Sequence, residues 1–237
     1  MIKGHKKVHI VPVAFELDRA VLPVLEIGAD RVYVLTGAQE GEGPVCSVMG
    51  QKVKKKLEKR IKEVKVINYG FYDYDNIFKH LVKIAKDEKD NHVMINLSSG
   101  GRIVAIAGTL AASMYGWSPY YAKPKKYGGK ERSRGLDEIF EIMTYPVERP
   151  EEELVTCLSL MDGIETQKSL MNKLEKAGAF VDQEPGEKLS KRSYMEFKRR
   201  YMDPLVDSGW ITKDTKGRTS RLEITREGEE IVRIFSI

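Results

Sequence analysis

The segment 93–115 contains the residues whose types and spacing are best suited to chemistry in this chain. An apolar run at 93–95 fits the end of a buried strand, and the apolar and small residues from 102 onward fit a buried helix. A strand followed by a small-residue turn and a helix start presents free backbone N–H groups to an anion. The turn therefore predicts a phosphate-binding site, made of Asn96, Ser98, Ser99, Gly100, Gly101 and Arg102.

A purely structural turn is the alternative interpretation of the same residues. The turn matches neither the P-loop pattern nor GxGxxG. Ser and Gly at the start of a helix often serve only to cap it. The residues alone leave both interpretations open.

The composition bounds the class of protein. A chain of 237 residues with 41% hydrophobic and 32% charged residues is long enough for one large or two modest soluble domains. Cys46 and Cys157 lie far apart, the four histidines lack metal-like spacing, and no apolar run reaches the length of a membrane span. We therefore expect a cytoplasmic protein without a membrane anchor, a metal or a resident cofactor.

Residues 1–148 alternate strands with amphipathic helices, which predicts a mostly parallel, Rossmann-like sheet covered by helices on both faces. The expected strands are 7–15, 31–35, 65–69, 93–95, 118–122 and 140–146. The expected helices are 22–27, 53–64, 75–87 and 102–115.

Such sheets bind ligands at the carboxyl ends of their strands, where the loops 15–19, 36–50, 70–75 and 96–102 should converge. Besides the turn residues, we therefore assign ligand binding to Phe15, Asp18, Arg19, Thr36 and Gly37. The basic segment 123–134 is either a flap over this edge or a solvated loop.

In residues 149–237 the sequence pattern changes, and it predicts helices followed by a hairpin. Helices are expected at 151–161, 166–177 and 190–208, hairpin strands at 210–213 and 221–225, and a last helix at 226–234. Three helices followed by a basic hairpin is the order of elements in a winged helix-turn-helix. The chain is thus expected to join a Rossmann-like α/β domain, 1–148, to a smaller winged-helix domain, 149–237.

The charge of the second domain is concentrated in one stretch. Residues 188–221 hold ten Lys or Arg against four Asp or Glu, while 151–237 as a whole holds fifteen against seventeen. A basic third helix and wing favour double-stranded DNA, and a protein–protein winged helix is the alternative. The residues assigned to DNA binding are Lys191, Arg192, Ser193, Lys198, Arg199, Lys216, Arg218 and Arg221. One small module binds weakly, so a dimer is expected to recognise two half-sites.

No carboxylate pair or Cys–His arrangement indicates an enzyme. One enzymatic alternative remains, the metal-independent cleavage of a bound ribo-oligonucleotide. In it, Ser98, Ser99 and Arg102 would align a 2′-hydroxyl of a bound ribo-oligonucleotide for attack on its own phosphate.

The turn NLSSGGR, its small-residue helix and the ending RLEITREGEEIVRIF resemble archaeal CARF-domain (CRISPR-associated Rossmann fold) transcriptional regulators with a MarR-like winged helix. The resemblance covers nearly the whole chain. It implies a homodimer whose two turns clasp a cyclic oligonucleotide as the effector. The resemblance further implies that this effector is a cyclic oligoadenylate, most often the tetraadenylate. By position, residues 96 and 98–102 match the family's fourth-strand motif and 15–19 its first-strand loop. The expectation is a ligand-responsive DNA-binding regulator. The alternatives are a metal-independent ring nuclease that degrades the cyclic oligoadenylate and a winged-helix protein-interaction module.

Overall fold

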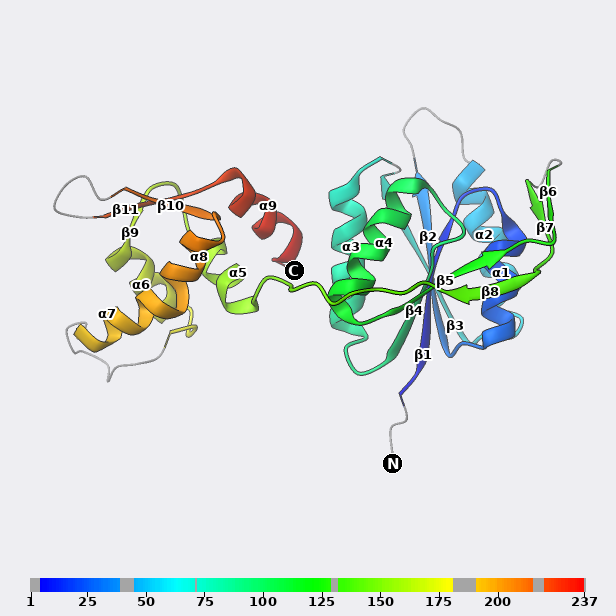
Figure 1. Cartoon of the computed structure of the whole chain (residues 1–237), viewed down its shortest axis with the longest axis horizontal. Coiled ribbons are helices and arrows are strands. Elements are labelled where there is room, and N and C mark those ends of the chain that lie inside the picture. The colour runs from blue at the N-terminus through cyan, green and yellow to red at the C-terminus, as the bar shows by residue number, and fades with distance from the viewer. Residues whose placement is uncertain are drawn as a thin grey trace. The chain divides into compact units, whose positions relative to one another are not determined.

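The computed structural model describes residues 5–38, 45–70, 72–128, 132–180, 191–214 and 220–236. The chain divides into two compact units, Met1–Glu148 and Arg149–Ile237, which are called unit 1 and unit 2 below. Figure 1 shows the elements of both units.

Unit 1 is built on a six-stranded sheet in the order β3-β2-β1-β4-β5-β8. β1 to β5 run parallel, and β8 runs antiparallel to β5. The strands are β1 (Lys7–Val13), β2 (Arg31–Ala38), β3 (Glu63–Gly70), β4 (His92–Asn96), β5 (Ser118–Lys123) and β8 (Glu138–Glu141). A mostly parallel α/β sheet confirms the expected fold class.

Four helices connect these strands and cover the sheet. They are α1 (Leu17–Ile27), α2 (Val45–Leu57), α3 (Tyr74–Asp87) and α4 (Arg102–Tyr115). α1 and α2 lie on one face, and α3 and α4 lie on the other (Figure 1). The chain adds β2 and β3 on one side of β1 and then β4 and β5 on the other, so the carboxyl ends of β1 and β4 form the switch point where such sheets bind ligands.

The predicted boundaries of α2 are wrong. The helix was expected at 53–64, but it spans Val45–Leu57, and β3 begins at Glu63. Val53, Leu57, Ile61 and Val64 all contact one core cluster, which explains the helical periodicity. Val64, however, pairs with Val32 in the sheet, and this pairing decides its backbone conformation.

The start of α1 was also placed too late. The helix begins at Leu17 rather than 22 and contains Pro23, while Gly28 ends it as expected with φ of +81°. Proline has no N–H, so Pro23 cannot donate to the carbonyl of Arg19 one turn earlier. That carbonyl is therefore available to another donor.

The basic segment after β5 forms a small hairpin rather than a solvated loop. β6 (Lys126–Tyr127) pairs antiparallel with β7 (Ser133–Arg134), and β7 contacts α1. β8 follows at Glu138–Glu141, earlier and shorter than the strand expected at 140–146.

Unit 2 has the elements of a winged helix. Its helical elements are α5 (Glu152–Ser159), α6 (Gln167–Lys176), α7 (Lys191–Phe197), the π-helix η1 (Lys198–Met202), α8 (Asp203–Asp207) and α9 (Arg226–Phe235). Its strands are β9 (Glu165–Thr166), β10 (Ile211–Asp214) and β11 (Arg221–Ile224), in the order β10-β11-β9. The strand β9 was not predicted. Thr166 caps α6 as expected, because its side chain accepts a hydrogen bond from the N–H of Ser169.

The expected third helix of unit 2 is present as one helical run, 191–207, which joins α7, η1 and α8 and is called the recognition helix below. Its apolar face is buried, with Phe197, Tyr201 and Leu205 at 0% exposure. Phe180 packs edge-on against Phe197 and Tyr201, with ring centroids 6.2 and 6.1 Å away. This aromatic cluster fixes the helix and turns its cationic face outward.

Candidate functional site

The two serines of the β4–α4 turn point into the protein. Ser98 and Ser99 are 6% and 3% exposed. The hydroxyl of Ser99 donates to the carbonyl of Pro12 in β1 at 2.5 Å, and the hydroxyl and N–H of Ser98 both donate to Asn96 Oδ1. These hydroxyls hold the turn against the sheet and do not face the solvent.

Asn96 connects the turn to α1. Its side chain is fully buried, and its amide nitrogen Nδ2 donates to the carbonyl of Arg19 at 2.8 Å. This is the carbonyl that Pro23 leaves without a helical donor. Pro23 in α1 thus leaves free the carbonyl that Asn96, the last residue of β4, binds, although the two residues lie far apart in the sequence.

Gly100 brings the turn into contact with β1. Its φ is +92°, a conformation that residues with a side chain rarely adopt. A Cβ at this position would lie 2.6 Å from Pro12 Cβ and 3.0 Å from Val104 Cγ1. Glycine is therefore required here for both its conformation and its size.

The first turn of α4 is left open at its N-terminus. The N-cap, Gly101, has no side chain to cap the helix, and the first hydrogen bond of this turn runs from the N–H of Ala105 to the carbonyl of Gly101 at 3.1 Å. The N–H groups of Arg102, Ile103 and Val104 therefore lack intrahelical acceptors. We call these three N–H groups the open end of α4. The exposed side chain of Arg102, which has no partner among the described residues, adds a positive charge there.

The first-strand loop lies beside this turn, but its arginine is buried. Arg19 is 5% exposed; its Nη1 donates to Glu16 Oε2 at 2.8 Å and its Nε to the carbonyl of Ala122 at 3.0 Å. Its guanidinium also lies 4.8 Å from the ring centroid of Tyr121. Arg19 thus connects α1 to β5 and positions the loop.

Phe15 and Asp18 are half-buried and contact the β6–β7 hairpin. Asp18 Oδ2 accepts the N–H of Gly135 at 2.8 Å. The guanidinium of Arg132 lies 4.0 Å from the ring centroid of Phe15. Arg132 belongs to the basic segment 123–134, for which a flap over this edge was one interpretation, but the sequence did not indicate that Arg132 or Gly135 would contact this loop.

Thr36 and Gly37 are buried at the end of β2. A Cβ at Gly50 of α2 would lie 3.0 Å from Thr36 Cβ, so α2 covers this strand end closely. The structure therefore brings residues 15–19 and 96–102 together through Asn96 and Ser99, and it places the side chain of Thr36 under α2.

A buried histidine lies on the sheet below the turn. His9 in β1 is 0% exposed, and its Nδ1 lies 3.1 Å from the hydroxyl of Tyr120 in β5. Burial is the main reason that the pKa of His9 falls from 6.5 to about 4. His9 is thus neutral at pH 7 and stays inside the core.

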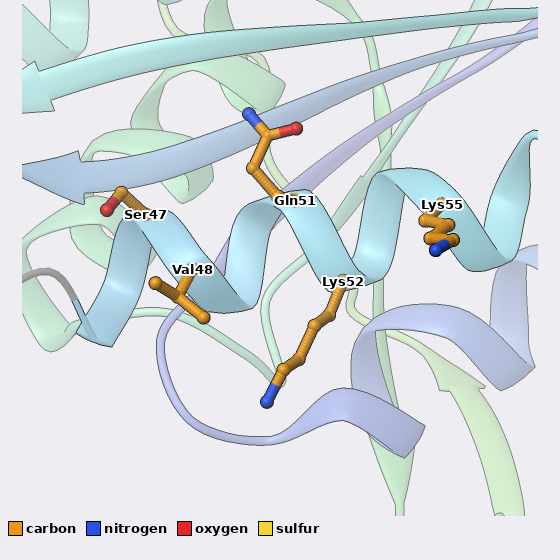
Figure 2. Close-up of a pocket in the computed structure, with 5 residues that line it drawn as sticks. All are labelled: Ser47, Val48, Gln51, Lys52 and Lys55. Carbon is orange, nitrogen blue, oxygen red and sulfur yellow. The ribbon is translucent and has the colours of Figure 1, made fainter.

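Figure 2 shows a separate hollow along one face of α2. Its lining residues, Ser47, Val48, Gln51, Lys52 and Lys55, all come from this single helix. The hollow is open to solvent and includes none of the residues that the sequence assigned to ligand binding. It does not extend the site at the switch point.

The recognition helix of unit 2 presents cations in a different way. Lys198 and Arg199 are exposed, as is Arg221 on β11. Ser193 is 1% exposed, so its side chain belongs to the core side of the helix. The side chains of Lys191 and Arg192, and all of Lys216 and Arg218, lie outside the described residues.

In the part of the chain that the structure describes, no three His, Cys, Asp or Glu side chains gather as metal ligands would. None of its helices has both the length and the apolar character needed to span a membrane.

The two units together define a class of protein: a Rossmann-like α/β domain followed by a winged-helix domain. Residues 7–127, just over half of the chain, match the family described as "HFX_2341_N:-like, N-terminal", and the chain belongs to this family. Residues 147–236 match the DUF6293 C-terminal winged helix domain.

The chain is similar to one curated relative and to several solved structures. Uncharacterized protein MJ1513 of Methanocaldococcus jannaschii is 27% identical over 128 residues, which cover 50% of this chain and 38% of that relative. Can2 from Sulfobacillus thermosulfidooxidans, solved in complex with cyclic tetra-adenylate, has a TM-score of 0.45 at 12% identity over 95% of this chain and 63% of its own. Enterococcus italicus Csm6, bound to cyclic hexa-2′-fluoro-hexa-dAMP, has a TM-score of 0.41 at 12% identity over 87% and 56%. The chain thus spans less than two thirds of each.

Proposed function

We propose that this protein is a ligand-responsive, DNA-binding transcriptional regulator. Unit 1 binds a phosphate-containing effector at the switch point of its sheet, and unit 2 binds double-stranded DNA. The effector class is a cyclic oligoadenylate, as the resemblance of the turn to CARF-domain regulators implies.

The open end of α4 is the observation that carries the proposal. Ser98 and Ser99 could cap a helix, but both hydroxyls donate inward, to Asn96 and Pro12. The N–H groups of α4 are therefore left for an external acceptor, next to the exposed Arg102. An anionic oxygen satisfies these donors and interacts favourably with the helix dipole.

Exposed apolar side chains on α4 and on the segment that follows β8 support a homodimer. Ile106 is 64% exposed and lies one turn beyond Arg102 on the same helix face. Met143 and Tyr145 are 77% and 72% exposed, in a segment whose Val147 N–H donates to the carbonyl of Ser113 in α4 at 3.3 Å. A second copy that covers these side chains would bring two Arg102 side chains to one cleft, which suits a ligand with two-fold symmetry.

The exposed cations of the recognition helix support DNA as the partner of unit 2. Lys198 and Arg199 are exposed on this helix, whose buried aromatic face fixes their direction, and Arg221 is exposed on β11. Phosphate contacts of this kind make affinity fall steeply with salt. Fluorescence anisotropy with labelled duplex DNA at 50 and 200 mM salt tests this, and an absence of binding at both salts would favour the protein–protein alternative.

The inward direction of the serines bears on the ring-nuclease alternative. That mechanism needs Ser98 or Ser99 beside the ligand, whereas both hydroxyls are held by acceptors inside the fold. We therefore propose ligand sensing rather than cleavage. Product analysis after incubation with cyclic oligoadenylates tests this choice, because a cleaved product that disappears in Ser99→Ala would overturn it.

A thermal-shift titration with cyclic oligoadenylates of several ring sizes tests the ligand half directly. A ligand that binds only the folded protein raises its stability by about 2.7 kcal/mol at one hundred times its Kd. We expect a saturable rise for wild type that is lost in Arg102→Ala. Lys83→Ala, which removes an exposed cation from α3, should behave like wild type. A flat response of wild type across the panel would contradict the proposal.

A further inference from the structure

The β6–β7 hairpin is held beside the candidate ligand site by specific contacts. Asp18 accepts the N–H of Gly135, and Arg132 covers the ring of Phe15. At the base of the hairpin, the N–H of Asp137 donates to the carbonyl of Lys123 at 2.8 Å, and the two side chains form an ion pair, also at 2.8 Å. Figure 1 draws the hairpin next to α1. These contacts hold the hairpin in a defined position in unit 1.

The hairpin presents an uncovered aromatic ring on its inner face. Tyr127 pairs with Ser133 in the antiparallel ladder, so both side chains lie on the same face of the hairpin. Ser133 is 2% exposed, which identifies this face as the one turned toward the protein, yet Tyr127 is 67% exposed. One half of the face is packed, and the half that holds the ring is open.

Two buried polar groups beside this face have no hydrogen-bond partner. They are Arg19 Nη2 on α1 and Ser133 Oγ on β7, and these two elements contact each other. An unpaired buried polar group costs about 1 to 3 kcal/mol. Such a group calls for an explanation, and a bound ligand that supplies the missing partner is one.

Arg132 lies beside this face and combines a positive charge with an unusual backbone conformation. Its φ is +58°, and among the described non-glycine residues it is the one with positive φ. The conformation costs energy, and it directs the guanidinium over Phe15 in the first-strand loop. The N–H of Gly128 donates to the carbonyl of Arg132 at 2.8 Å, which keeps Arg132 beside Tyr127.

We infer that the hairpin is a nucleotide-recognition element of the ligand site. A nucleobase of the ligand stacks on Tyr127, and Arg132 binds a neighbouring phosphate. An aromatic ring beside an arginine is the combination that recognises an unpaired nucleotide. The inference rests on the proposed function, because it assigns to the hairpin one nucleotide of the effector whose other phosphate lies at the open end of α4.

Isothermal titration of cyclic tetraadenylate into the full chain tests the inference. Stacking on an aromatic residue contributes about 1 to 3 kcal/mol per base, so Tyr127→Leu should bind about tenfold more weakly than wild type. Tyr127→Phe keeps the ring and should recover most of this loss. Arg132→Asn removes the charge while tolerating the positive φ, and it should also weaken binding.

Controls separate this inference from the proposed function. Tyr194→Leu removes an exposed aromatic ring from unit 2 and should bind like wild type. If Arg102→Ala abolishes binding while Tyr127→Leu and Arg132→Asn bind like wild type, the hairpin inference is overturned and the proposed function stands. If wild type does not bind cyclic tetraadenylate, both are overturned. The melting temperature of each free variant verifies that it is folded.

Discussion

The β4–α4 turn of unit 1 and the recognition helix of unit 2 are both candidate phosphate-binding regions, and they use different parts of the chain. At the turn, Asn96, Ser98 and Ser99 are buried and hold the backbone, so that N–H groups face outward. On the recognition helix the backbone is internally bonded, and exposed side chains such as Arg199 carry the charge.

This difference sets how each region should respond to mutation. A site made of backbone groups depends on the residues that hold the backbone, so variants of these buried residues should lose stability. A site made of exposed side chains loses affinity while the fold is kept, since surface substitutions usually change stability by less than about 0.5 kcal/mol. The following predictions test this contrast.

Gly100→Ala should have the largest effect. The new Cβ would lie 2.6 Å from Pro12 Cβ, in a backbone conformation with φ of +92°. We expect a loss of about 3 kcal/mol in the free energy of unfolding of unit 1. Urea unfolding followed by the fluorescence of buried Trp117, in a Trp210→Phe background that removes the other tryptophan, measures it.

Gly116→Ala is the matched control for this prediction. Gly116 also has positive φ, +66°, but a Cβ there would meet nothing within 4 Å. Only the conformational cost of about 1 kcal/mol should appear. Equal losses for the two variants would show that the close approach of the turn to β1 is not what requires glycine.

Acidification should destabilise unit 1 through His9. The unfolded chain takes up a proton near pH 6.5, whereas the pKa of folded His9 is about 4. The free energy of unfolding therefore falls as the pH drops through this window, by about 2 kcal/mol between pH 7 and pH 5 from this group. The same tryptophan-monitored unfolding at both pH values measures the change. His9→Gln should reduce the pH dependence by this amount, and an unchanged pH dependence would contradict the burial argument.

Ser99→Ala should cost about 1 to 2 kcal/mol of stability, because it leaves the buried carbonyl of Pro12 without its donor. Ligand affinity of the folded protein should change little, since the hydroxyl does not face the ligand. Urea unfolding and calorimetric titration of the same preparation measure the two quantities. A large loss of affinity with unchanged stability would instead place the hydroxyl on the ligand.

Arg199→Ala should have the smallest effect on stability, within about 0.5 kcal/mol. It should weaken DNA binding and reduce the slope of log affinity against log salt by about one. Anisotropy titrations at several salt concentrations measure this. Arg226→Ala removes an exposed cation from α9 and serves as the control, with an unchanged slope expected.

The sequence predicted the parts of the fold that depend on local patterns. The apolar face of the recognition helix and the small-residue turn before α4 were both recognisable, because each lies within one segment. The limits of α2 were not, since Val64 fits a helical periodicity but pairs with Val32 in the sheet.

The direction of the turn side chains could not be predicted, for a similar reason. Ser99 faces inward because its acceptor is the carbonyl of Pro12, 87 residues earlier in the chain. Asn96 reaches Arg19 because Pro23 frees that carbonyl. Both contacts join segments that only the folded sheet brings together. The sequence therefore assigned these hydroxyls to the ligand, whereas in the structure they donate to acceptors within the fold.

The most direct test of the account is a titration of cyclic tetraadenylate followed by the backbone amide resonances of ¹⁵N-labelled protein. If the open end of α4 binds the phosphate, the amides of Arg102, Ile103 and Val104 should show the largest shifts, and Arg102→Ala should reduce them. Shifts confined to the α2 hollow around Lys52, with the α4 amides unchanged, would contradict the central claim.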